Sequence, residues 1–505
     1  MQAATKVVFN TAVLYAKILI SMAIALVSVP LVLKALGASD YGLYNLIAGI
    51  VSMLTFLNNS MTVSSQRYMS VAMGEGNVCK INSIYNASFI LHLVLAFGIV
   101  VALEIIGFPS INKLNIAPDR LWCAKIIFHF LVLSLFSRII AVPFDALMNA
   151  QEDMLAFSVI ELIDSLIMLA IAVTLQFIPI DKLVFYGVAV SAIAVLTLLM
   201  KLLWCRRAYK QFRISRHVKV DKSLIKEMLG FTGWNLFGGL AMMGRNQGVA
   251  VVFNVFLGTI ANAAYGVANQ INGALSQFSS TFQRAINPQL MKSEGMGNRA
   301  RLQRISIISS KFSALALCLI SIPLIILMDD VLQIWLKDNI PTSTLELSRC
   351  ILVLSIVYQF STGLMSAIQA TGQIKYYQIT MGLLILSNIP IAFILLKLDY
   401  PIYYVTIGFI VIETISLIIR IVMAKRLTGL MPKVYITQVL YPVFLIILVS
   451  VIACLIPYFI IDNMYVRLLI VSLTYGITYL VMMWIVALDE DHRQLILSKI
   501  KTIVK

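Results

Sequence analysis

Long apolar segments follow one another along almost the whole chain, and short polar stretches separate them. Each apolar segment holds roughly 20 residues, which as a helix matches the hydrocarbon core of a bilayer, about 30 Å thick. The pattern therefore predicts fourteen transmembrane helices. Their centres lie near residues 20, 54, 95, 132, 166, 193, 243, 272, 316, 357, 386, 412, 447 and 476.

The composition agrees with a membrane protein. Of the 505 residues, 60% are hydrophobic and only 12% are charged, whereas a soluble protein carries about 25% charged residues. The first apolar run, from about residue 7 to residue 33, is too long for the core of a signal peptide. We therefore expect it to be the first transmembrane helix. The six cysteines are scattered singly, so the sequence indicates no disulfide framework and no metal site, and we expect no cofactor.

The positive charge is arranged as in a membrane protein. The formal net charge is +16, and lysines and arginines gather in alternate loops, above all between Lys201 and Lys226. Positive charge marks the cytoplasmic side and contacts anionic lipid headgroups. We therefore expect both termini to be cytoplasmic and the partners to be membrane lipids, not nucleic acid. One predicted cytoplasmic loop, at residues 151–153, is acidic instead.

Two distant stretches carry the same order of residues. Residues 64–77 read SSQRYMSVAMGEGN, and residues 281–298 read TFQRAINPQLMKSEGMGN. Both contain Gln-Arg and then Gly-x-Gly-Asn. A second pair of similar stretches, ALMNAQEDM (146–154) and SAIQATGQI (366–374), is separated by almost the same interval as the two Gly-x-Gly-Asn motifs. This nearly constant offset predicts two parallel repeats, as secondary transporters often have. Gly-x-Gly-Asn predicts a turn, and each arginine is expected to be a cytoplasmic anchor.

These patterns predict an all-α polytopic membrane protein of about fourteen transmembrane helices, with two six-helix lobes related as repeats and two additional C-terminal helices. We predict an N-lobe at 1–204, a basic cytoplasmic connector at 205–228 and a C-lobe at 229–428. The two additional helices and a basic tail occupy 429–505. No loop is long enough to form a soluble domain.

Polar residues recur on one face of the second and the eighth predicted helices. Steps of three and four residues place them on a single stripe. A single polar residue in a membrane helix commonly bonds a neighbouring helix. A stripe that is polar throughout favours an aqueous cavity, because such a face against lipid would be costly. We therefore expect substrate contacts from asparagines of the two stripes, namely Asn45, Asn59, Asn269 and Asn272.

Basic residues also occur inside the predicted spans. An ionised side chain at the centre of a bilayer costs roughly 2.5–3.5 kcal/mol on insertion scales, so it needs a partner or a function. Lys17 lies in the first span, Arg138 in the fourth, and Arg245 in a glycine-rich part of the seventh. Arginine and lysine are well suited to phosphate. These three residues are therefore candidates to bind an anionic substrate.

Acidic residues within the spans are candidates for ion coupling. Glu161 and Asp164 are three residues apart in the fifth span, and Glu413 lies in the twelfth span. The alternative is internal ion pairing, for example between Lys17 and Asp164 on neighbouring helices. Buried charges in membranes commonly both pair and serve function, so the sequence leaves both interpretations open.

Two segments resemble Wzx-type polysaccharide flippases, which belong to the multidrug/oligosaccharidyl-lipid/polysaccharide exporter superfamily. They read PLVLKALGASDYGLYNLIAGIVSMLTFLNNSM (30–61) and VPFDALMNAQEDMLAFSVIELIDSLIMLA (142–170). The resemblance covers nearly the whole chain. It implies a flippase of the bacterial inner membrane that moves an undecaprenyl-pyrophosphate-linked oligosaccharide by alternating access. It further implies a cavity lined by basic residues, a proton or sodium ion as the coupling ion, and polysaccharide polymerases as partners.

Two alternatives within the superfamily remain open. A drug/cation antiporter favours a twelve-span chain and a more acidic cavity, and a lipid II flippase would use its last two helices to hold the lipid tail. A membrane enzyme such as a polysaccharide polymerase would carry a large outer loop with clustered Arg, His or Asp residues. The sequence has no such loop and no nucleophile or metal motif. We therefore expect a transporter and not an enzyme.

Overall fold

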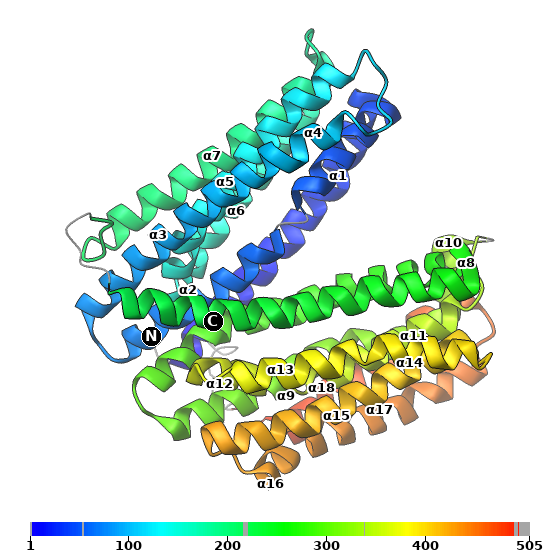
Figure 1. Ribbon diagram of the computed structural model, residues 1–505. Helices are drawn as coiled ribbons and strands as arrows, with labels where there is room; N and C mark the ends of the chain where they lie inside the picture. Colours follow the sequence, from blue (N-terminus) through cyan, green and yellow to red (C-terminus); the bar gives the residue numbers. More distant parts are fainter. Residues whose placement is uncertain (1–2, 53–54, 216–220, 338, 489–492, 494–505) are drawn as a thin grey trace, which may run out of the picture. The chain divides into compact units, whose positions relative to one another are not determined.

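The computed structural model is helical throughout the residues that it describes, which are 3–52, 55–215, 221–337, 339–488 and 493 (Figure 1). The side chains of residues 3–5, 8, 50, 52 and 55–59 are not described. Within the described ranges there is no strand. The predicted all-α membrane fold is therefore confirmed.

The first half of the chain contains seven α-helices before the long helix α8. They are α1 (Ala3–Ser52), α2 (Thr55–Gly74), α3 (Val78–Ala102), α4 (Phe108–Ile111), α5 (Leu121–Ala150), α6 (Met154–Thr174) and α7 (Lys182–Ala208). The second half runs from α8 (Lys222–Gly295) through α9 (Arg299–Ile326), α10 (Met328–Leu336), α11 (Thr344–Gln359), α12 (Thr362–Thr371), α13 (Lys375–Leu386) and α14 (Asn388–Lys397). It ends with α15 (Ile402–Thr428), α16 (Pro432–Tyr435), α17 (Tyr441–Ile460) and α18 (Met464–Met482).

The number of spans differs from the predicted fourteen. Within the described ranges, eleven helical stretches are long and apolar enough to cross a membrane, or twelve if the bent pair α11–α12 forms one span. The count of fourteen is therefore not confirmed. α8 has 74 residues and consists of two helical segments that meet at the non-helical Gly258, and it contains the seventh and eighth predicted spans. The second predicted span includes residues 53–54, which the structure does not describe, and its described parts are the end of α1 and the beginning of α2.

The backbone repeats the offset found in the sequence. α1 and α8 each bend at a glycine with positive φ, namely Gly37 at 77° and Gly258 at 76°. These two glycines are separated by the same interval as the two Gly-x-Gly-Asn motifs. Gly76 and Gly297, the second glycines of those motifs, have φ values of 71° and 67°. Because glycine adopts this left-handed conformation without a steric cost, it suits both places. The predicted turns at the two motifs are confirmed.

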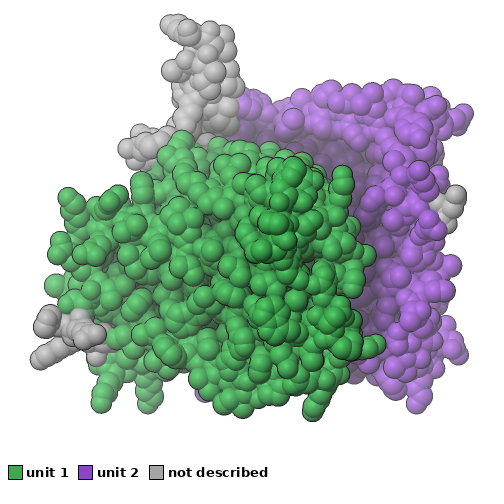
Figure 2. All heavy atoms as spheres, turned by 90° about the horizontal axis from the view of Figure 1, so that it is seen from above, with its two compact units in different colours: residues 1–239, 284–298 green, residues 240–283, 299–505 purple. Residues whose placement is uncertain are grey.

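The chain divides into two compact units, which are coloured separately in Figure 2. The first unit consists of residues 1–239 and 284–298, and the second of residues 240–283 and 299–505. The division falls within α8 and not in the connector, and the end of α8 belongs to the first unit. α8 therefore contributes to both units. The predicted boundaries of lobes, connector and tail stay a prediction.

α5 is the most deeply buried helix of the first unit and packs against α1, α2, α3 and α7. Gly187 of α7 lies so close to α5 that a Cβ atom there would be 2.8 Å from Cγ2 of Ile127. Small residues allow such close approach between membrane helices. The first unit thus has a tight helical core around α5, which positions the polar side chains on its neighbours.

Arg120 at the start of α5 ties three helices of the first unit together. Its guanidinium donates to Asp181 at 2.5 Å and to Asp40 at 2.7 Å. Asp181 also caps α7 by accepting from the backbone N–H of Val184 at 3.0 Å. Partial burial alone would raise the pKa of Asp181, but the Val184 amide and the Arg120 guanidinium outweigh it and hold that pKa below its ordinary value. This stabilisation is present at neutral pH and is lost as the pH falls through the lowered pKa.

The last two long helices belong to the core of the second unit. α17 and α18 pack against each other and against α9. Tyr475 and Tyr479 of α18 are fully buried, and their hydroxyls donate to the backbone carbonyls of Cys318 and Leu315 in α9. Buried tyrosine hydroxyls need such partners, so these bonds fix α18 against α9.

Candidate functional site

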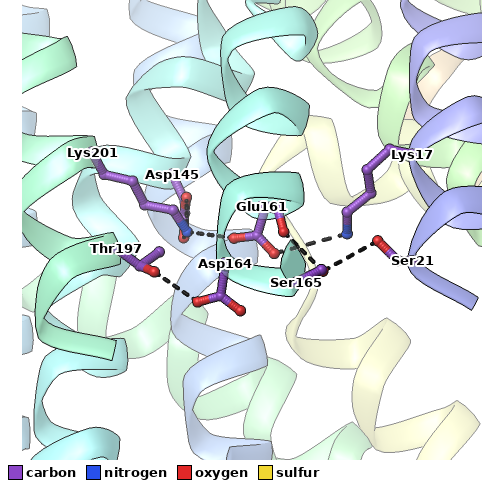
Figure 3. Close-up of polar contacts among 8 residues, drawn as sticks. All are labelled: Lys17, Ser21, Asp145, Glu161, Asp164, Ser165, Thr197 and Lys201. Atoms are coloured by element: carbon purple, nitrogen blue, oxygen red, sulfur yellow. Dashed lines mark hydrogen bonds and ion pairs between the residues drawn. The ribbon is translucent and has the colours of Figure 1, made fainter. Parts of the chain in front are cut away.

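A cluster of charged side chains lies among the helices of the first unit (Figure 3). It draws on α1, α5, α6 and α7, all of which are apolar enough to cross a membrane. In such helices an ionised group requires a partner or a function. The members of the cluster are Lys17, Asp145, Glu161, Asp164 and Lys201.

Glu161 lies between two lysines. On one side, the Lys201 ammonium donates to Glu161 at 2.8 Å and forms an ion pair with Asp145 at 2.9 Å. On the other side, the Lys17 ammonium is 3.8 Å from Glu161. Lys201 is only 4% exposed, so its two carboxylate partners are what allow it to stay charged. The ion pair of Lys17 forms with Glu161 and not with Asp164.

Asp164 lies one turn further along α6 and lines a cavity. Its carboxylate accepts from the Thr197 hydroxyl of α7 at 2.7 Å. The cavity has a volume of about 240 Å³, enough for several water molecules. α1, α6 and α7 form its wall, with Ser21, Ser28, Tyr41, Ser165 and Tyr186 among the lining residues. Ile24, Val29, Val32 and Met168 also line the cavity, so Asp164 brings a carboxylate into a small, mainly apolar space.

A third cation comes from the part of α8 that belongs to the first unit. The Arg284 guanidinium lies 3.9 Å from the centroid of the Phe157 ring and interacts electrostatically with Asp145 and Glu161. Within the described residues it has no hydrogen-bond or ion-pair partner, although the group carries five N–H donors. Its side chain is half-buried. These donors are therefore available to an anionic ligand.

The two arginines of the repeated Gln-Arg pair each lie over an aromatic ring. Arg67 is 7% exposed, and its guanidinium lies 5.1 Å from the centroid of the Phe231 ring. Arg284 lies over Phe157. An aromatic ring from a distant segment covers each guanidinium, and such cation–π contacts stabilise a cation away from water. The predicted role as a cytoplasmic anchor stays a prediction.

Two asparagines of the polar stripes make the same local bond. The Asn45 side chain donates to the Tyr41 carbonyl at 2.9 Å, and the Asn269 side chain donates to the Tyr265 carbonyl at 2.8 Å. Each bond joins residues four apart in one helix, and both asparagines are exposed. Their amide oxygens therefore face away from the helix and can accept from a ligand.

The rest of the eighth predicted span bonds within the second unit. Asn272 accepts a hydrogen bond from Ser355 of α11. Gln283 donates to Ser313 of α9 at 2.7 Å. These contacts are the helix-to-helix bonds that polar residues commonly form in membranes. Asn59 lies outside the residues whose side chains are described.

The other two basic candidates do not join the charged cluster. Arg138 of α5 is exposed and has no hydrogen-bond or ion-pair partner in the described part of the chain. Arg245 lies in the second unit, where its guanidinium bonds the neighbouring Asn246 at 2.8 and 3.1 Å. The structure therefore brings Lys17 to the acidic candidates and places Arg138 and Arg245 elsewhere.

Glu413 is paired in the second unit. It forms an ion pair with Arg420, which follows later in α15, and both side chains are buried. Arg420 also donates to the hydroxyl of Ser361 at 2.9 Å. Glu413 is thus neutralised by its neighbour, whereas Asp164 bonds a neutral hydroxyl.

Comparison with known families identifies the chain. The sequence profile of a family described as polysaccharide biosynthesis protein matches residues 7–294, which is more than half of the 505 residues. The chain belongs to this family. The predicted superfamily of multidrug, oligosaccharidyl-lipid and polysaccharide exporters is thereby confirmed, and this family member is a transporter-like membrane protein. No curated protein matches the sequence.

Solved structures of the same superfamily share the fold. A multidrug resistance MATE family transporter of the MOP superfamily, in an outward-facing conformation, has a TM-score of 0.73 at 15% identity, over 85% of this chain and 97% of that one. A mutant of a MATE transporter reaches 0.75 at 14% identity, with the same two coverages. A MOP superfamily transporter from Pyrococcus furiosus reaches 0.70 at 14% identity, again over 85% and 97%. At these identities the likeness shows the fold alone.

Sequence reasoning misses three residues of this site, namely Asp145, Lys201 and Arg284. The run of lysines and arginines that follows Lys201 groups this residue with the basic connector. Its flanking residues, LLM before and LLWC after, are apolar, and this signal places it inside the preceding span. Arg284 carries no comparable signal, because its contact with Phe157 depends on how distant helices pack.

Proposed function

We propose that this polysaccharide biosynthesis family protein flips a lipid-linked oligosaccharide across the bacterial inner membrane by alternating access. The substrate would be an undecaprenyl-pyrophosphate-linked repeat unit of O-antigen, capsule or exopolysaccharide. It would be taken from the cytoplasmic leaflet, with both termini of the protein in the cytoplasm, and delivered to a polysaccharide polymerase on the other side. The observation that carries the proposal is the family match over residues 7–294.

The charged cluster supports a phosphate-bearing substrate. Arg284 offers a planar set of donors without a bonded partner among the described residues, and such a fork matches the oxygens of a phosphate. Lys17, whose side chain is 20% exposed, is held only loosely by Glu161 at 3.8 Å. We assign the pyrophosphate to these two cations. Arg138 and Arg245, with Asn45, Asn59, Asn269 and Asn272, are the candidates for further phosphate and sugar contacts along the path.

Removing the gene from its host tests the function. Cells without the protein should lose surface polysaccharide and accumulate the lipid-linked oligosaccharide in the inner leaflet, because polymerisation on the outer side would lack its substrate. A plasmid copy should restore export. Mass spectrometry of extracted lipids and staining of surface polysaccharide measure the two effects. Unchanged polysaccharide in the deletion strain would contradict the proposal.

Ion coupling is assigned to Asp164, with Glu161 and Glu413 as the further candidates. Asp164→Asn preserves the bond to Thr197 and removes the titratable carboxyl. It should reduce gradient-driven translocation at least tenfold, while downhill exchange of substrate in the absence of a gradient continues. Transport into proteoliposomes, measured with and without imposed proton and sodium gradients, distinguishes gradient-driven translocation from downhill exchange. If Asp164→Asn responds to the gradient as the native protein does, Asp164 has no coupling role.

The second candidate function is drug or cation antiport. The similar structures include a multidrug resistance MATE family transporter, and the carboxylate of Asp164 lines a cavity. The Pyrococcus furiosus transporter, however, is described as having a binding pocket of reversed polarity that suggests a different function. The cations of the present chain favour an anionic substrate. Efflux of ethidium that depends on this protein would favour the antiporter instead.

A further inference from the structure

The end of α8 belongs to a different unit from the middle of the same helix. Residues 240–283 are part of the second unit, and residues 284–298, which we call the α8 strap, are part of the first. A proline inside the helix, Pro288, lies about one turn beyond the boundary, within the α8 strap. Proline has no N–H to donate to the Arg284 carbonyl one turn earlier, so it weakens and kinks a helix. At the repeat offset, the equivalent position in α2 is Arg67, so the first repeat has no proline there.

Two glycines hold the α8 strap against α2. A Cβ atom at Gly74 would overlap the backbone carbonyl oxygen of Lys292, and one at Gly295 would overlap that of Val71. Gly74 and Gly295 are the first glycines of the two Gly-x-Gly-Asn motifs, and the carbonyls they face are separated by the same interval as the motifs. The contact is therefore reciprocal. The repeated motif supplies a turn through its second glycine and a helix contact through its first.

An acidic side chain binds the same segment from the turn between α5 and α6. Glu152 is 4% exposed. Its carboxylate accepts from Gln289 at 2.5 Å, pairs with Lys292 and lies 3.7 Å from Lys6. The carbonyl of Glu152 accepts from Asn10 at 3.1 Å. This one residue thus joins the α8 strap to the beginning of α1.

Glu152 occupies a backbone position that suits glycine. Its φ is 61°, and the equivalent residue of the second repeat is Gly372, with a φ of 80°. A side chain is disfavoured in this conformation. The strained glutamate in the first repeat is explained by its contact with the α8 strap, and the second repeat has no such carboxylate.

We propose that the α8 strap is a releasable clasp. In this state, Glu152 and the contacts of Gly74 and Gly295 hold the α8 strap to the first unit. In another state of the transport cycle, the α8 strap pivots at Pro288 and leaves that unit. This proposal rests on the proposed transport function. A helix shared by two units must bend or detach if the units move. The polar bonds of the contact converge on Glu152, beside the buried side chains of Ile286, Leu290 and Met291. Pro288 lies inside the same segment.

Cysteine labelling tests the clasp. Ser293 of the α8 strap and Ser306 of α9 are both 0% exposed, and Ser→Cys at either is a small change. Cys79 is the exposed cysteine of the chain and is replaced by serine first. In inside-out membrane vesicles, an impermeant maleimide should label Ser293→Cys slowly. Adding Glu152→Gly, which removes the carboxylate and relieves the backbone, should speed that labelling at least tenfold. Ser306→Cys in the second unit should stay protected.

Matched variants distinguish the clasp from general loosening. Gly74→Ala should also expose Ser293→Cys, because its Cβ pushes against the α8 strap. Gly273→Ala in the same helix should not, since a Cβ there meets no atom within 4 Å. Equal labelling of Ser293→Cys in all backgrounds, or labelling that rises together at Ser293→Cys and Ser306→Cys, would overturn the clasp. The labelling needs no substrate, so increased labelling without any export of oligosaccharide would refute the proposed function and leave the clasp intact.

Discussion

Lys201→Met should lower the free energy of unfolding by about 3–5 kcal/mol, because removing one partner of a buried ion pair leaves an uncompensated charge. Here two carboxylates would be left, since Lys201 pairs with both Asp145 and Glu161. Methionine preserves the length and the apolar stem. We expect poor insertion and a protein that unfolds at a much lower denaturant concentration in detergent. Chemical unfolding followed by tryptophan fluorescence measures the effect.

The neighbouring lysine and the carboxylates provide controls for this prediction. Lys17→Met should destabilise far less, because Lys17 is more exposed and lies 3.8 Å from Glu161. Neutralising the carboxylates in the Lys201→Met background, with Asp145→Asn and Glu161→Gln, should recover most of the loss. If Lys201→Met is as stable as the native protein, Lys201 does not hold these carboxylates in the membrane.

Arg284→Ala should abolish export of surface polysaccharide, with a loss of at least tenfold, while the amount of inserted protein stays the same. A tenfold loss corresponds to about 1.4 kcal/mol. The guanidinium lacks a hydrogen-bonded partner in the described structure and stacks on Phe157, so its removal takes away a contact for the substrate and breaks no ion pair. Surface polysaccharide and protein level in the deletion strain are the measurements.

Further variants test whether Arg284 binds the substrate through its guanidinium group. Arg284→Lys retains the charge without the planar fork and should be intermediate. Arg207→Ala, at an exposed position in the last turn of α7, should leave export unchanged. Lys17→Ala and Arg245→Ala should also reduce export if both bind substrate. Normal export in Arg284→Ala would show that Arg284 does not bind the substrate. Normal export in Lys17→Ala and Arg245→Ala would exclude Lys17 and Arg245 from the binding site.

The local features of this protein can be predicted from its sequence, whereas the pairing of its charged side chains cannot. The glycines at 76 and 297 predict turns from the sequence alone, because few other residues adopt a positive φ. Glu161 and Asp164 share a face of α6 because they are three residues apart. Which lysine meets Glu161 depends on how α1, α6 and α7 pack. For the same reason the rings over Arg67 and Arg284 could not be foreseen.

The acidic loop at residues 151–153 shows how packing reverses an interpretation from charge. By its sequence it weakens the predicted topology only slightly, because the positive-inside rule counts Lys and Arg and not net charge. In the structure, Glu152 is turned inward and binds Lys292 and Gln289. Asp153 caps α6 and accepts from Tyr209 at 2.6 Å. Both carboxylates therefore serve the fold, and the loop carries little information about topology.

The substrate class is tested most directly by reconstitution. Purified protein in proteoliposomes should move an undecaprenyl-pyrophosphate-linked oligosaccharide between leaflets, measured by the access of an added glycosidase to the sugar. The native protein should increase the rate at least tenfold over empty liposomes, Arg284→Ala should not, and neither should transport ethidium. Movement of ethidium by the native protein, with no movement of the lipid-linked oligosaccharide, would contradict the proposed function.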